Sequence, residues 1–252
     1  MSELIRLDGK VAVITGAAGG MGHAIAQRMV ARGAAVVLTD RDPAVLAQAV
    51  DVDPDAVALI HDVTSVGDAQ AVMADVRDRF GRLDILVNNA GWDRPSLFAD
   101  SDPDDWQQVV QINYLGVVTC SYAALALLRE APEGGAIVSI ASDTARVGGW
   151  GEAVYAGAKA GVVAFSKSLA REVARDGVRV NCVSPAVTQT AFQDRLAADP
   201  IGAKIVEGAI RSAPMRRAAV PEEIAEAVAF MASPAAGFIT GQVLSVNGGV
   251  VM

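Results

Sequence analysis

The chain alternates short apolar runs with longer segments in which apolar residues recur at helical spacing. The short runs are rich in β-branched residues and predict buried strands. They lie at residues 11–15, 35–39, 56–61, 83–88, 136–140, 177–183 and 242–246. Helical spacing and helix-start residues predict helices between them. These helices lie at residues 23–32, 43–50, 66–80, 104–129, from 153 onward, and at 221–231.

Strands that alternate with helices at this spacing favour right-handed crossovers and a parallel sheet. We therefore expect one α/β domain over residues 1–252, with a doubly wound, seven-stranded parallel sheet flanked by helices. Residues 191–217 are rich in Ala, Asp and Arg and have weak periodicity. We predict that they form a mobile pair of short helices that covers the site.

Glycines and polar residues follow the strands at the sheet edge where parallel α/β folds bind ligands. The turn from Gly16 to Gly22 lies between a strand and a helix. Its glycines allow a phosphate to approach the backbone, and the helix start offers free N–H groups. Asp40, Asp62 and Asn89 follow the next three strands. Any one of them could be a turn residue, but together they predict a ligand site.

Asp40 lies where a carboxylate that binds the ribose of a dinucleotide belongs, about twenty residues past the glycine turn. A carboxylate accepts hydrogen bonds from ribose hydroxyls and repels a 2′-phosphate, which favours NAD over NADP. Arg41 complicates this interpretation, because an arginine can hold a 2′-phosphate. The alternative for Asp40 is a turn-opening role before residues 41–43.

Ser142, Tyr155 and Lys159 form a candidate set for proton transfer. Tyr155 and Lys159 are four residues apart, so they share one face of the predicted helix. A phenol alone is a weak base at neutral pH, and a nearby ammonium is expected to lower its pKa. Ser142 follows the strand at 136–140 and reaches the same place from another element. Such a trio suits proton exchange with an alcohol or carbonyl oxygen, although the Tyr–Lys spacing alone also fits an ordinary helix face.

Composition excludes several classes of function. The net charge of −8 argues against nucleic acid or an anionic membrane as a partner. Cys120 and Cys182 are far apart and have no metal-ligand spacing, and the two histidines lie outside any ligand cluster. The first residues contain no apolar core of a signal peptide, and apolar runs are broken by glycine or charge. We expect a cytoplasmic protein without a metal.

Together these motifs resemble the short-chain dehydrogenase/reductase family, over nearly the whole chain and with a Rossmann fold. The resemblance rests on Thr15-Gly16-x3-Gly20-x-Gly22, Asp62-Val63, Asn88-Asn89-Ala90-Gly91, Asn113, Ser142, Tyr155-x3-Lys159, Pro185 and Ile239-Thr240-Gly241. The family usually has glycine after that proline, whereas this chain has Ala186.

The resemblance implies a role for each matching residue. Tyr155 would be the general base or acid, Lys159 would lower its pKa and bond the nicotinamide ribose, and Ser142 would orient the substrate oxygen. Asn113 would help a water link Lys159 to solvent; from its position alone, it could equally bond its own helix. The cofactor contacts implied are Gly16, Gly20, Met21, Gly22, Asp40, Asp62, Val63, Asn89, Tyr155, Lys159, Thr188 and Thr190.

Segments around Trp92, Ser142 and Tyr155 further resemble hydroxycyclohexanecarbonyl-CoA dehydrogenases. This resemblance implies an NAD-dependent oxidation of a cyclic or β-hydroxyacyl-CoA alcohol to a ketone. Trp92 and Trp150 would then wall the substrate pocket, and Arg146 would meet a carboxylate, thioester or phosphate. The alternative is that the two tryptophans pack loops and Arg146 pairs with a surface acid.

Two other functions compete with this hypothesis. A 3-oxoacyl-carrier-protein reductase would use the same residues in the opposite direction with NADPH, and Asp40 argues against it. A binding protein that senses the cofactor without catalysis would not need a complete proton-transfer set. The family resemblance also implies a homotetramer, whereas the residues alone do not distinguish a dimer from a tetramer.

Overall fold

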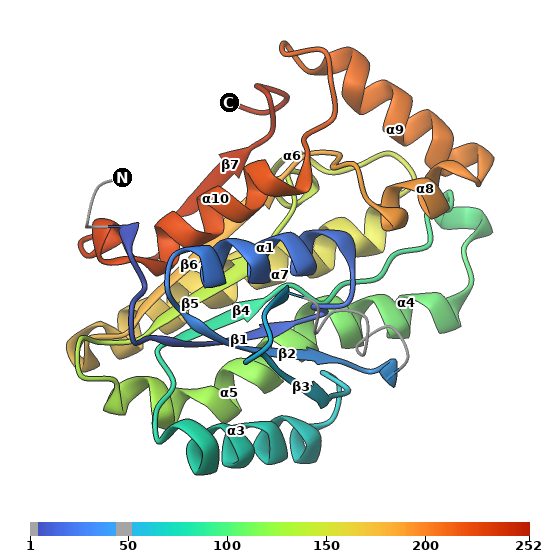
Figure 1. Cartoon of the computed structure of the whole chain (residues 1–252). Helices are drawn as coiled ribbons and strands as arrows, with labels where there is room; N and C mark the ends of the chain where they lie inside the picture. The colour runs from blue at the N-terminus through green and yellow to red at the C-terminus, as the bar shows by residue number, and fades with distance from the viewer. Residues whose placement is uncertain (1–4, 44–51) are drawn as a thin grey trace.

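The computed structural model describes residues 5–43 and 52–252. Within them, seven strands form one parallel sheet in the order β3-β2-β1-β4-β5-β6-β7 (Figure 1). The strands are β1 Val11–Thr15, β2 Ala35–Asp40, β3 Val57–Ile60, β4 Ile85–Asn88, β5 Ala136–Ile140, β6 Arg179–Pro185 and β7 Val243–Val246. The predicted fold class is confirmed, and the helix predicted at 43–50 lies outside the described residues apart from Pro43.

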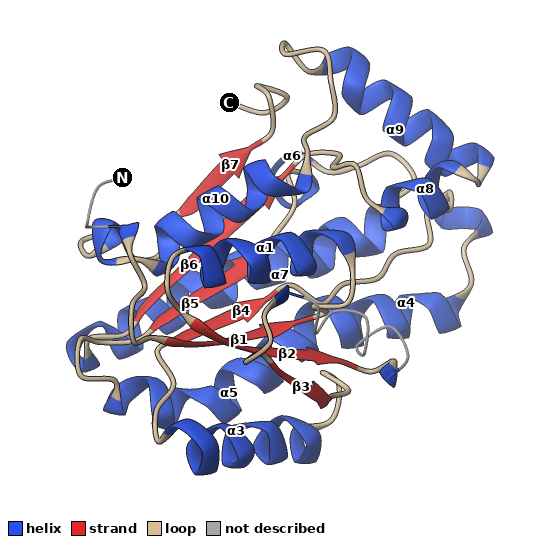
Figure 2. Cartoon of the chain, viewed as in Figure 1, coloured by secondary structure: helices blue, strands red, loops and turns tan. Residues whose placement is uncertain are grey.

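Helices cover both faces of the sheet (Figure 2). Helices α1 (Gly20–Ala31) and α10 (Pro221–Ala232) pack together on one face. Helices α3 (Val66–Phe80), α5 (Gly116–Glu130) and α7 (Ala153–Val173) lie on the other. Successive side chains of a strand point to opposite faces, so Ile14 joins the core under α1 and α10, whereas Val13 joins the core under α3, α5 and α7. Burial on both faces explains why the strands are continuous apolar runs.

The helix predicted at residues 104–129 is interrupted. Helix α4 (Pro103–Val110) passes into a π-helical turn, Gln111–Leu115, and then into α5. By length and composition, the whole stretch Pro103–Glu130 is the one candidate membrane span among the described residues, with 44% of its most apolar window buried in the fold. Since α5 packs against α3 and its buried side chains belong to the core, the stretch fits a core helix.

Three short helices lie beyond the carboxyl ends of the strands: α6 (Thr144–Val147), α8 (Ala191–Ala197) and α9 (Pro200–Ser212). Helices α8 and α9 pack on each other and stand apart from the sheet in Figure 1. They match the pair of short helices predicted for residues 191–217. Each begins with a side-chain cap: Thr190 accepts a bond from the Gln193 amide, and Asp199 accepts one from Ile201.

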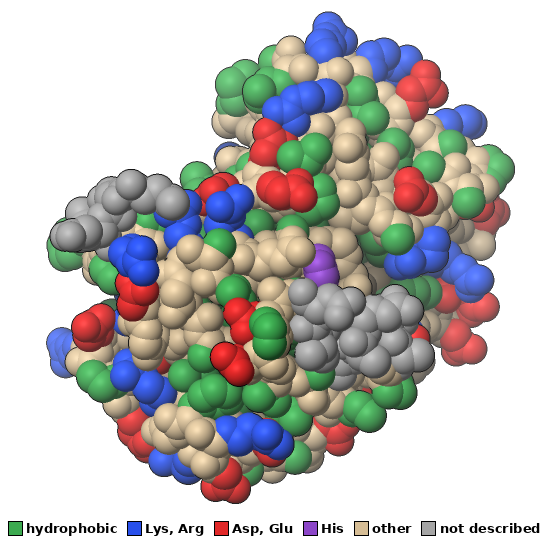
Figure 3. Space-filling model, in the orientation of Figure 1, with side chains coloured by type: hydrophobic (Ala, Val, Ile, Leu, Met, Phe, Trp, Pro, Cys, Tyr) green, Lys and Arg blue, Asp and Glu red, His purple; other side chains and the backbone are tan. Residues whose placement is uncertain are grey.

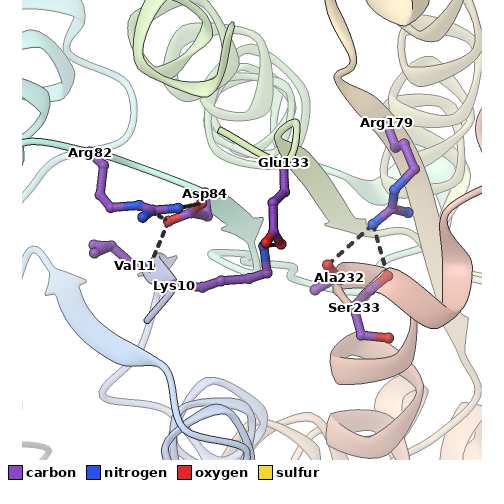
Figure 4. A network of polar contacts seen from close by, with 8 residues as sticks. All are labelled: Lys10, Val11, Arg82, Asp84, Glu133, Arg179, Ala232 and Ser233. Carbon is purple, nitrogen blue, oxygen red and sulfur yellow. Dashed lines mark hydrogen bonds and ion pairs between the residues drawn. The ribbon is translucent and has the colours of Figure 1, made fainter. Parts of the chain in front are cut away.

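Buried charges hold the amino-terminal edge of the sheet (Figure 4). Asp84 accepts hydrogen bonds from the Val11 amide at 2.9 Å and from Arg82 at 2.6 Å. At β6, the half-buried Arg179 donates to the carbonyl oxygens of Ala232 and Ser233, both at 3.2 Å. A guanidinium suits the unsatisfied carbonyls at the end of α10. This network therefore fixes the edge opposite the one where the predicted site residues lie.

The face of the molecule seen in Figure 3 mixes acidic and basic side chains over the same elements. On this face the basic side chains do not gather into one continuous stripe. The arrangement agrees with the net charge of −8, which predicts that polyanions are not general partners.

Candidate active site

A cavity of about 730 Å³ opens at the carboxyl ends of the strands. Gly16, Asp40, Asp62 and Asn89, which follow four neighbouring strands, all line it. The order of the strands reverses between β1 and β4, and crevices at such a reversal are the usual ligand sites of open α/β sheets. The predicted convergence of these residues is therefore present in the structure.

The glycine turn leaves open backbone next to the start of α1. Gly16 has a φ of +64°, which favours glycine. A Cβ atom on Gly22 would lie 2.3 Å from the Gly16 carbonyl oxygen, so the turn has no room for a larger residue. Asn89 fixes the turn by donating to the carbonyl oxygens of Thr15 at 3.0 Å and Gly16 at 2.9 Å. Helix α1 has no side-chain cap, so its first amides are available to a phosphate.

The adenosine end of the predicted cofactor site is lined by acidic residues. Asp40 ends β2 and accepts a hydrogen bond from the Asp42 amide at 3.3 Å, and Arg41 beside it also lines the cavity. Asp62 accepts bonds from the amide and the hydroxyl of Thr64, and these bonds hold the pKa of Asp62 below its usual range. Val63 and Met21 complete this part of the lining. The set fits the ribose and adenine of a dinucleotide.

Ser142, Tyr155 and Lys159 meet in the cavity. Ser142 lies two residues beyond β5, and Tyr155 and Lys159 lie on one face in the first turns of α7. The Ser142 hydroxyl lies close enough to Tyr155 to lower the pKa of the phenol. Thr144 Oγ1 donates to Ser142 Oγ at 3.0 Å, and Lys159 Nζ donates to the Ile140 carbonyl oxygen at 2.8 Å. The structure therefore assembles the predicted proton-transfer set from two elements.

Burial, rather than the ammonium, governs the acidity of Tyr155. Burial raises the pKa of the Tyr155 phenol, the nearby carboxyls of Glu152 and Asp93 raise it further, and the bond from Ser142 opposes them. Lys159 Nζ lies 5.7 Å from the centre of the tyrosine ring, and burial lowers the pKa of Lys159 to about 8. Lys159 donates to a backbone carbonyl oxygen, and its role in lowering the pKa of Tyr155 stays a prediction. With its pKa raised by burial, Tyr155 is protonated at neutral pH.

Asn113 lies in the π-helical turn and is fully buried. Its amide donates to the carbonyl oxygens of Trp92 at 2.6 Å and Val109 at 2.9 Å, and its oxygen accepts from the Trp92 amide at 3.3 Å. A Cβ atom on Gly91 would lie 3.1 Å from Asn113 Oδ1 and 3.8 Å from Lys159 Nζ. Asn113 therefore bonds its own helix and also fixes the cavity loop beside Lys159, and its role in linking Lys159 to solvent through a water stays a prediction.

Comparison with known proteins agrees with this geometry. A sequence model of the family described as Enoyl-(Acyl carrier protein) reductase matches residues 16–251. The chain is 39% identical over 246 residues to the 3-oxoacyl-[acyl-carrier-protein] reductase FabG of Salmonella typhimurium, and the match covers 97% of this chain and 98% of that protein. The chain belongs to the short-chain dehydrogenase/reductase family.

Two further relatives support the assignment to the short-chain dehydrogenase/reductase family. The (5R,7aS)-5-hydroxy-7a-methyl-1-oxo-2,3,5,6,7,7a-hexahydro-1H-indene-carboxyl-CoA reductase of Mycobacterium tuberculosis is 39% identical over 252 residues, covering 96% of this chain and 93% of that protein. The crystal structure of gox2181 matches with a TM-score of 0.92 at 32% identity and covers 98% of both chains. Members of this family use a nicotinamide cofactor, and the chain is an oxidoreductase.

The loop that resembles the nicotinamide-binding loop of short-chain dehydrogenases lies on the opposite wall of the cavity. Thr188 and Thr190 line it, as does Ala186, the residue that departs from the family pattern. The Thr188 hydroxyl donates to the Ala186 carbonyl oxygen at 3.0 Å, which fixes the loop. Beyond it, α8 and α9 contribute largely apolar lining side chains, including Phe192, Leu196, Ile205 and Val206.

Of the three substrate residues suggested by the sequence, not all lie in the lining of the cavity. Trp92 lines the cavity, whereas Arg146 and Trp150 lie outside its lining. Arg146 donates to the Ser245 hydroxyl at 3.0 Å rather than to a surface acid. Trp150 is 55% exposed, with Lys204 Nζ 5.9 Å from its ring centre. The structure therefore brings one of the three predicted residues to the substrate side.

The lining residues that were not predicted from the sequence include two carboxyls next to Tyr155. Asp93 follows Trp92 in the loop after β4, and Glu152 lies immediately before α7, three residues before Tyr155. Burial raises the pKa of each carboxyl to about 7. In the sequence, the two residues lie near Gly91 and Tyr155, and this position could have drawn attention to them. Acidic residues are also common in exposed loops and at helix starts, however. Their burial is visible only in the fold.

Proposed function

We propose that this chain reduces a 3-oxoacyl thioester to the 3-hydroxyacyl thioester with a nicotinamide dinucleotide. The carrying observation is the meeting of Ser142, Tyr155 and Lys159 in one cavity. Relatives matched over nearly their whole length support the substrate class, since their names specify reductases of acyl-carrier-protein and CoA thioesters. The direction is the reverse of the oxidation suggested by the closer resemblance in the sequence.

The residues of the site suit reduction of a carbonyl group. A bound nicotinamide supplies the hydride that the carbonyl carbon receives. Tyr155, protonated because burial raises its pKa, gives its proton to the carbonyl oxygen, which becomes the hydroxyl of the product. Ser142 donates a hydrogen bond to the same oxygen and stabilises the charge that develops there. Lys159 carries a positive charge beside the tyrosine ring.

We propose NAD(H) as the cofactor, on the strength of Asp40. Its carboxylate lines the cavity at the end of β2, where it accepts ribose hydroxyls and repels a 2′-phosphate. Arg41 lines the same region and is the residue that would support NADP(H). The comparisons do not decide between the two cofactors.

A second candidate is a dehydrogenase or reductase of a cyclic CoA thioester, as the resemblance to hydroxycyclohexanecarbonyl-CoA dehydrogenases implies. The specific observation in its favour is the relative from Mycobacterium tuberculosis, whose name describes a ring-bearing CoA thioester. Trp92 offers a flat apolar wall for a ring inside the cavity. We further propose that the protein is a cytoplasmic homotetramer, as the resemblance to the short-chain dehydrogenase/reductase family implies.

The purified protein should be assayed for oxidation of NADH and NADPH with three substrate classes. The first class is linear 3-oxoacyl thioesters of CoA and of acyl carrier protein. The second is CoA thioesters of ring carboxylic acids that carry an oxo group at position 2 of the ring, and the third is ketones without a thioester. We expect the linear thioesters to give the highest kcat/KM. A preference for the cyclic thioesters would favour the second candidate. Turnover confined to simple ketones would contradict both.

A further inference from the structure

Asp93 and Glu152 bring two carboxyl groups to the catalytic tyrosine from separate segments. Asp93 lies in the loop after β4, and Glu152 lies at the start of α7. Both line the 730 Å³ cavity together with Tyr155, and both also border a smaller hollow beside the same residue. The charge of each raises the pKa of Tyr155, and Asp93 acts in the same way on Glu152. The three residues therefore line the same part of the cavity.

Neither carboxyl has a close basic partner. Among residues 5–43 and 52–252, the ion pairs of the structure include neither Asp93 nor Glu152. Arg94, the nearest arginine in the chain, pairs instead with Asp105 at 3.3 Å. Asp93 Oδ2 is buried and accepts no hydrogen bond. A buried carboxyl oxygen without a partner is costly, so it indicates a group that the substrate completes.

Two half-buried carboxyls that line the same cavity without an ion pair do not both ionise readily. Burial raises the pKa of each to about 7. The other charged groups that face them are Lys159 on α7, which favours ionised Asp93, and Asp105 on α4, which opposes it. At and below neutral pH the pair therefore keeps a proton and offers an O–H donor to the cavity.

We propose that Asp93 and Glu152 set substrate specificity by donating a hydrogen bond to the thioester carbonyl oxygen of the acyl substrate. This inference rests on the proposed function. In a 3-oxoacyl thioester, the second carbonyl is separated from the reacting carbonyl by one carbon atom. When Ser142 and Tyr155 hold the reacting oxygen, the second oxygen stays near Tyr155, in the cavity that the two carboxyls also line. That oxygen is an acceptor, so a protonated carboxyl binds it and an ionised one repels it.

The test compares two substrates of matched chain length, a 3-oxoacyl-CoA and a ketone that lacks the thioester carbonyl. The measured quantity is the ratio of their kcat/KM values at pH 6, 7 and 8. Loss of one such hydrogen bond is worth about a factor of ten. We expect Asp93→Ala and Glu152→Ala to lower the ratio about tenfold at pH 6. The exposed carboxyl Asp104 provides the control, since Asp104→Asn should leave the ratio unchanged.

The pH dependence separates hydrogen bonding from packing. In the wild-type protein the ratio should fall between pH 6 and 8, as the pair loses its proton. The variants Asp93→Asn and Glu152→Gln keep an N–H donor that does not titrate. They should retain a higher ratio than the alanine variants at pH 6 and show a flatter profile. Cofactor binding, followed by nicotinamide fluorescence, reports that each variant is folded.

The possible negative results distinguish a failure of this inference from a failure of the proposed function. Equal losses of kcat/KM on both substrates, or amide variants that behave like alanine, would overturn this inference and leave the proposed function standing. Absence of thioester turnover in the wild-type protein would overturn both. A ratio that rises with pH would show that ionised carboxyls do not repel the thioester carbonyl, and would also overturn the inference.

Discussion

At the scale of single residues, the protonation state of Tyr155 defines its role when a carbonyl group is reduced. A phenol whose pKa is raised by burial is a proton donor over the physiological range. Its partner Ser142 is itself fixed by Thr144, whose hydroxyl donates to Ser142 Oγ at 3.0 Å. Because the serine oxygen accepts from Thr144, its own proton is free to point toward Tyr155 or a substrate. The arrangement is that of an acid ready for a carbonyl oxygen.

We expect Tyr155→Phe to lower kcat by a factor of about 10² to 10⁴, since proton transfer by a positioned side chain contributes this much. The ring and its contacts remain, so the Kd for the nicotinamide cofactor should change little. Steady-state kinetics and fluorescence titration measure the two quantities. The exposed Tyr122 gives the matched control, because Tyr122→Phe removes a hydroxyl outside the cavity. Wild-type turnover in Tyr155→Phe would contradict the assigned role.

Asp40 is expected to set the choice of cofactor. Replacing it in Asp40→Ser removes the charge that repels a 2′-phosphate, so kcat/KM with NADPH should rise relative to NADH by about tenfold or more. Arg41→Ala provides the second arm, because it removes the residue that would hold the phosphate. A wild-type preference for NADPH that Arg41→Ala abolishes would assign the selection to Arg41 instead.

At the scale of elements, the pattern of apolar residues predicted most of the fold. The ends of the predicted strands agree within about two residues, and their alternation with helices gave a parallel sheet because crossovers have a fixed hand. The π-helical turn Gln111–Leu115 was missed. One extra residue in a turn hardly changes a helical pattern of apolar positions, and the turn depends on the bonds of Asn113 to Trp92 in a distant loop.

The same reasoning explains which site residues were predictable. Ser142, Tyr155 and Lys159 match a family motif when they are taken together with the other motifs of the chain, and the residues at strand ends follow from topology. Asp93 and Glu152 match no such motif, and their raised pKa values arise from burial by segments far away in the chain. Arg146 and Trp150 were suggested by local resemblance, but the path of their loop takes them outside the cavity lining. The site residues whose positions depend on the paths of loops could therefore not be predicted from the sequence pattern.

Asn113 connects the π-helical turn to the cavity loop, so its replacement should affect both stability and activity. Asn113→Ala leaves the buried backbone groups of Trp92 without partners, which should lower the free energy of unfolding by about 2–4 kcal/mol. The loop that carries Asp93 should also loosen and raise KM. Urea unfolding and kinetics measure these effects. Gln107→Ala, at an exposed position of α4, should stay within about 0.5 kcal/mol.

The glycine turn offers a second test at this scale. In Gly22→Ala, the new methyl group would meet the Gly16 carbonyl oxygen at 2.3 Å and the side chain of Asn89 at 2.8 Å. The turn must shift away from the phosphate site, so we expect cofactor affinity to fall at least tenfold and stability by about 1–3 kcal/mol. Gly208→Ala in α9, where a Cβ meets nothing within 4 Å, is the control. Unchanged affinity in Gly22→Ala would place the phosphates elsewhere.

At the scale of the whole molecule, stability and function occupy opposite edges of one sheet. The amino-terminal edge is tied by satisfied charges, with Asp84 accepting from Val11 and Arg82 and with Arg179 donating to the end of α10 (Figure 4). The carboxyl-terminal edge holds an open cavity in which Asp93 and Glu152 lack ionic partners among the described residues. Carboxyls without ionic partners lower the stability of the folded protein, and proteins keep such groups where they serve binding.

This division predicts that Asp93 and Glu152 lower the free energy of unfolding by an amount that depends on pH. Their pKa values in the folded protein are raised to about 7 from ordinary values near 4, so the folded state binds more protons than the unfolded state between pH 4 and 7. The contribution of these two carboxyls to the stability of the wild-type protein should therefore be fully present below pH 4 and should decline as the pH rises to 7. The double variant Asp93→Asn with Glu152→Gln lacks this decline.

Urea unfolding without cofactor or substrate should show the double variant gaining about 2 kcal/mol on the wild-type protein between pH 5 and 8, because each unit of raised pKa is worth about 1.4 kcal/mol and the partly open cavity reduces the total. Asp104→Asn, at an exposed carboxyl, should instead run parallel to the wild-type protein across this range. If the double variant also ran parallel, the two carboxyls would be hydrated and ionised when the protein is folded. The two carboxyls would then stay charged between pH 6 and 8, and the wild-type preference for thioesters would not change with pH.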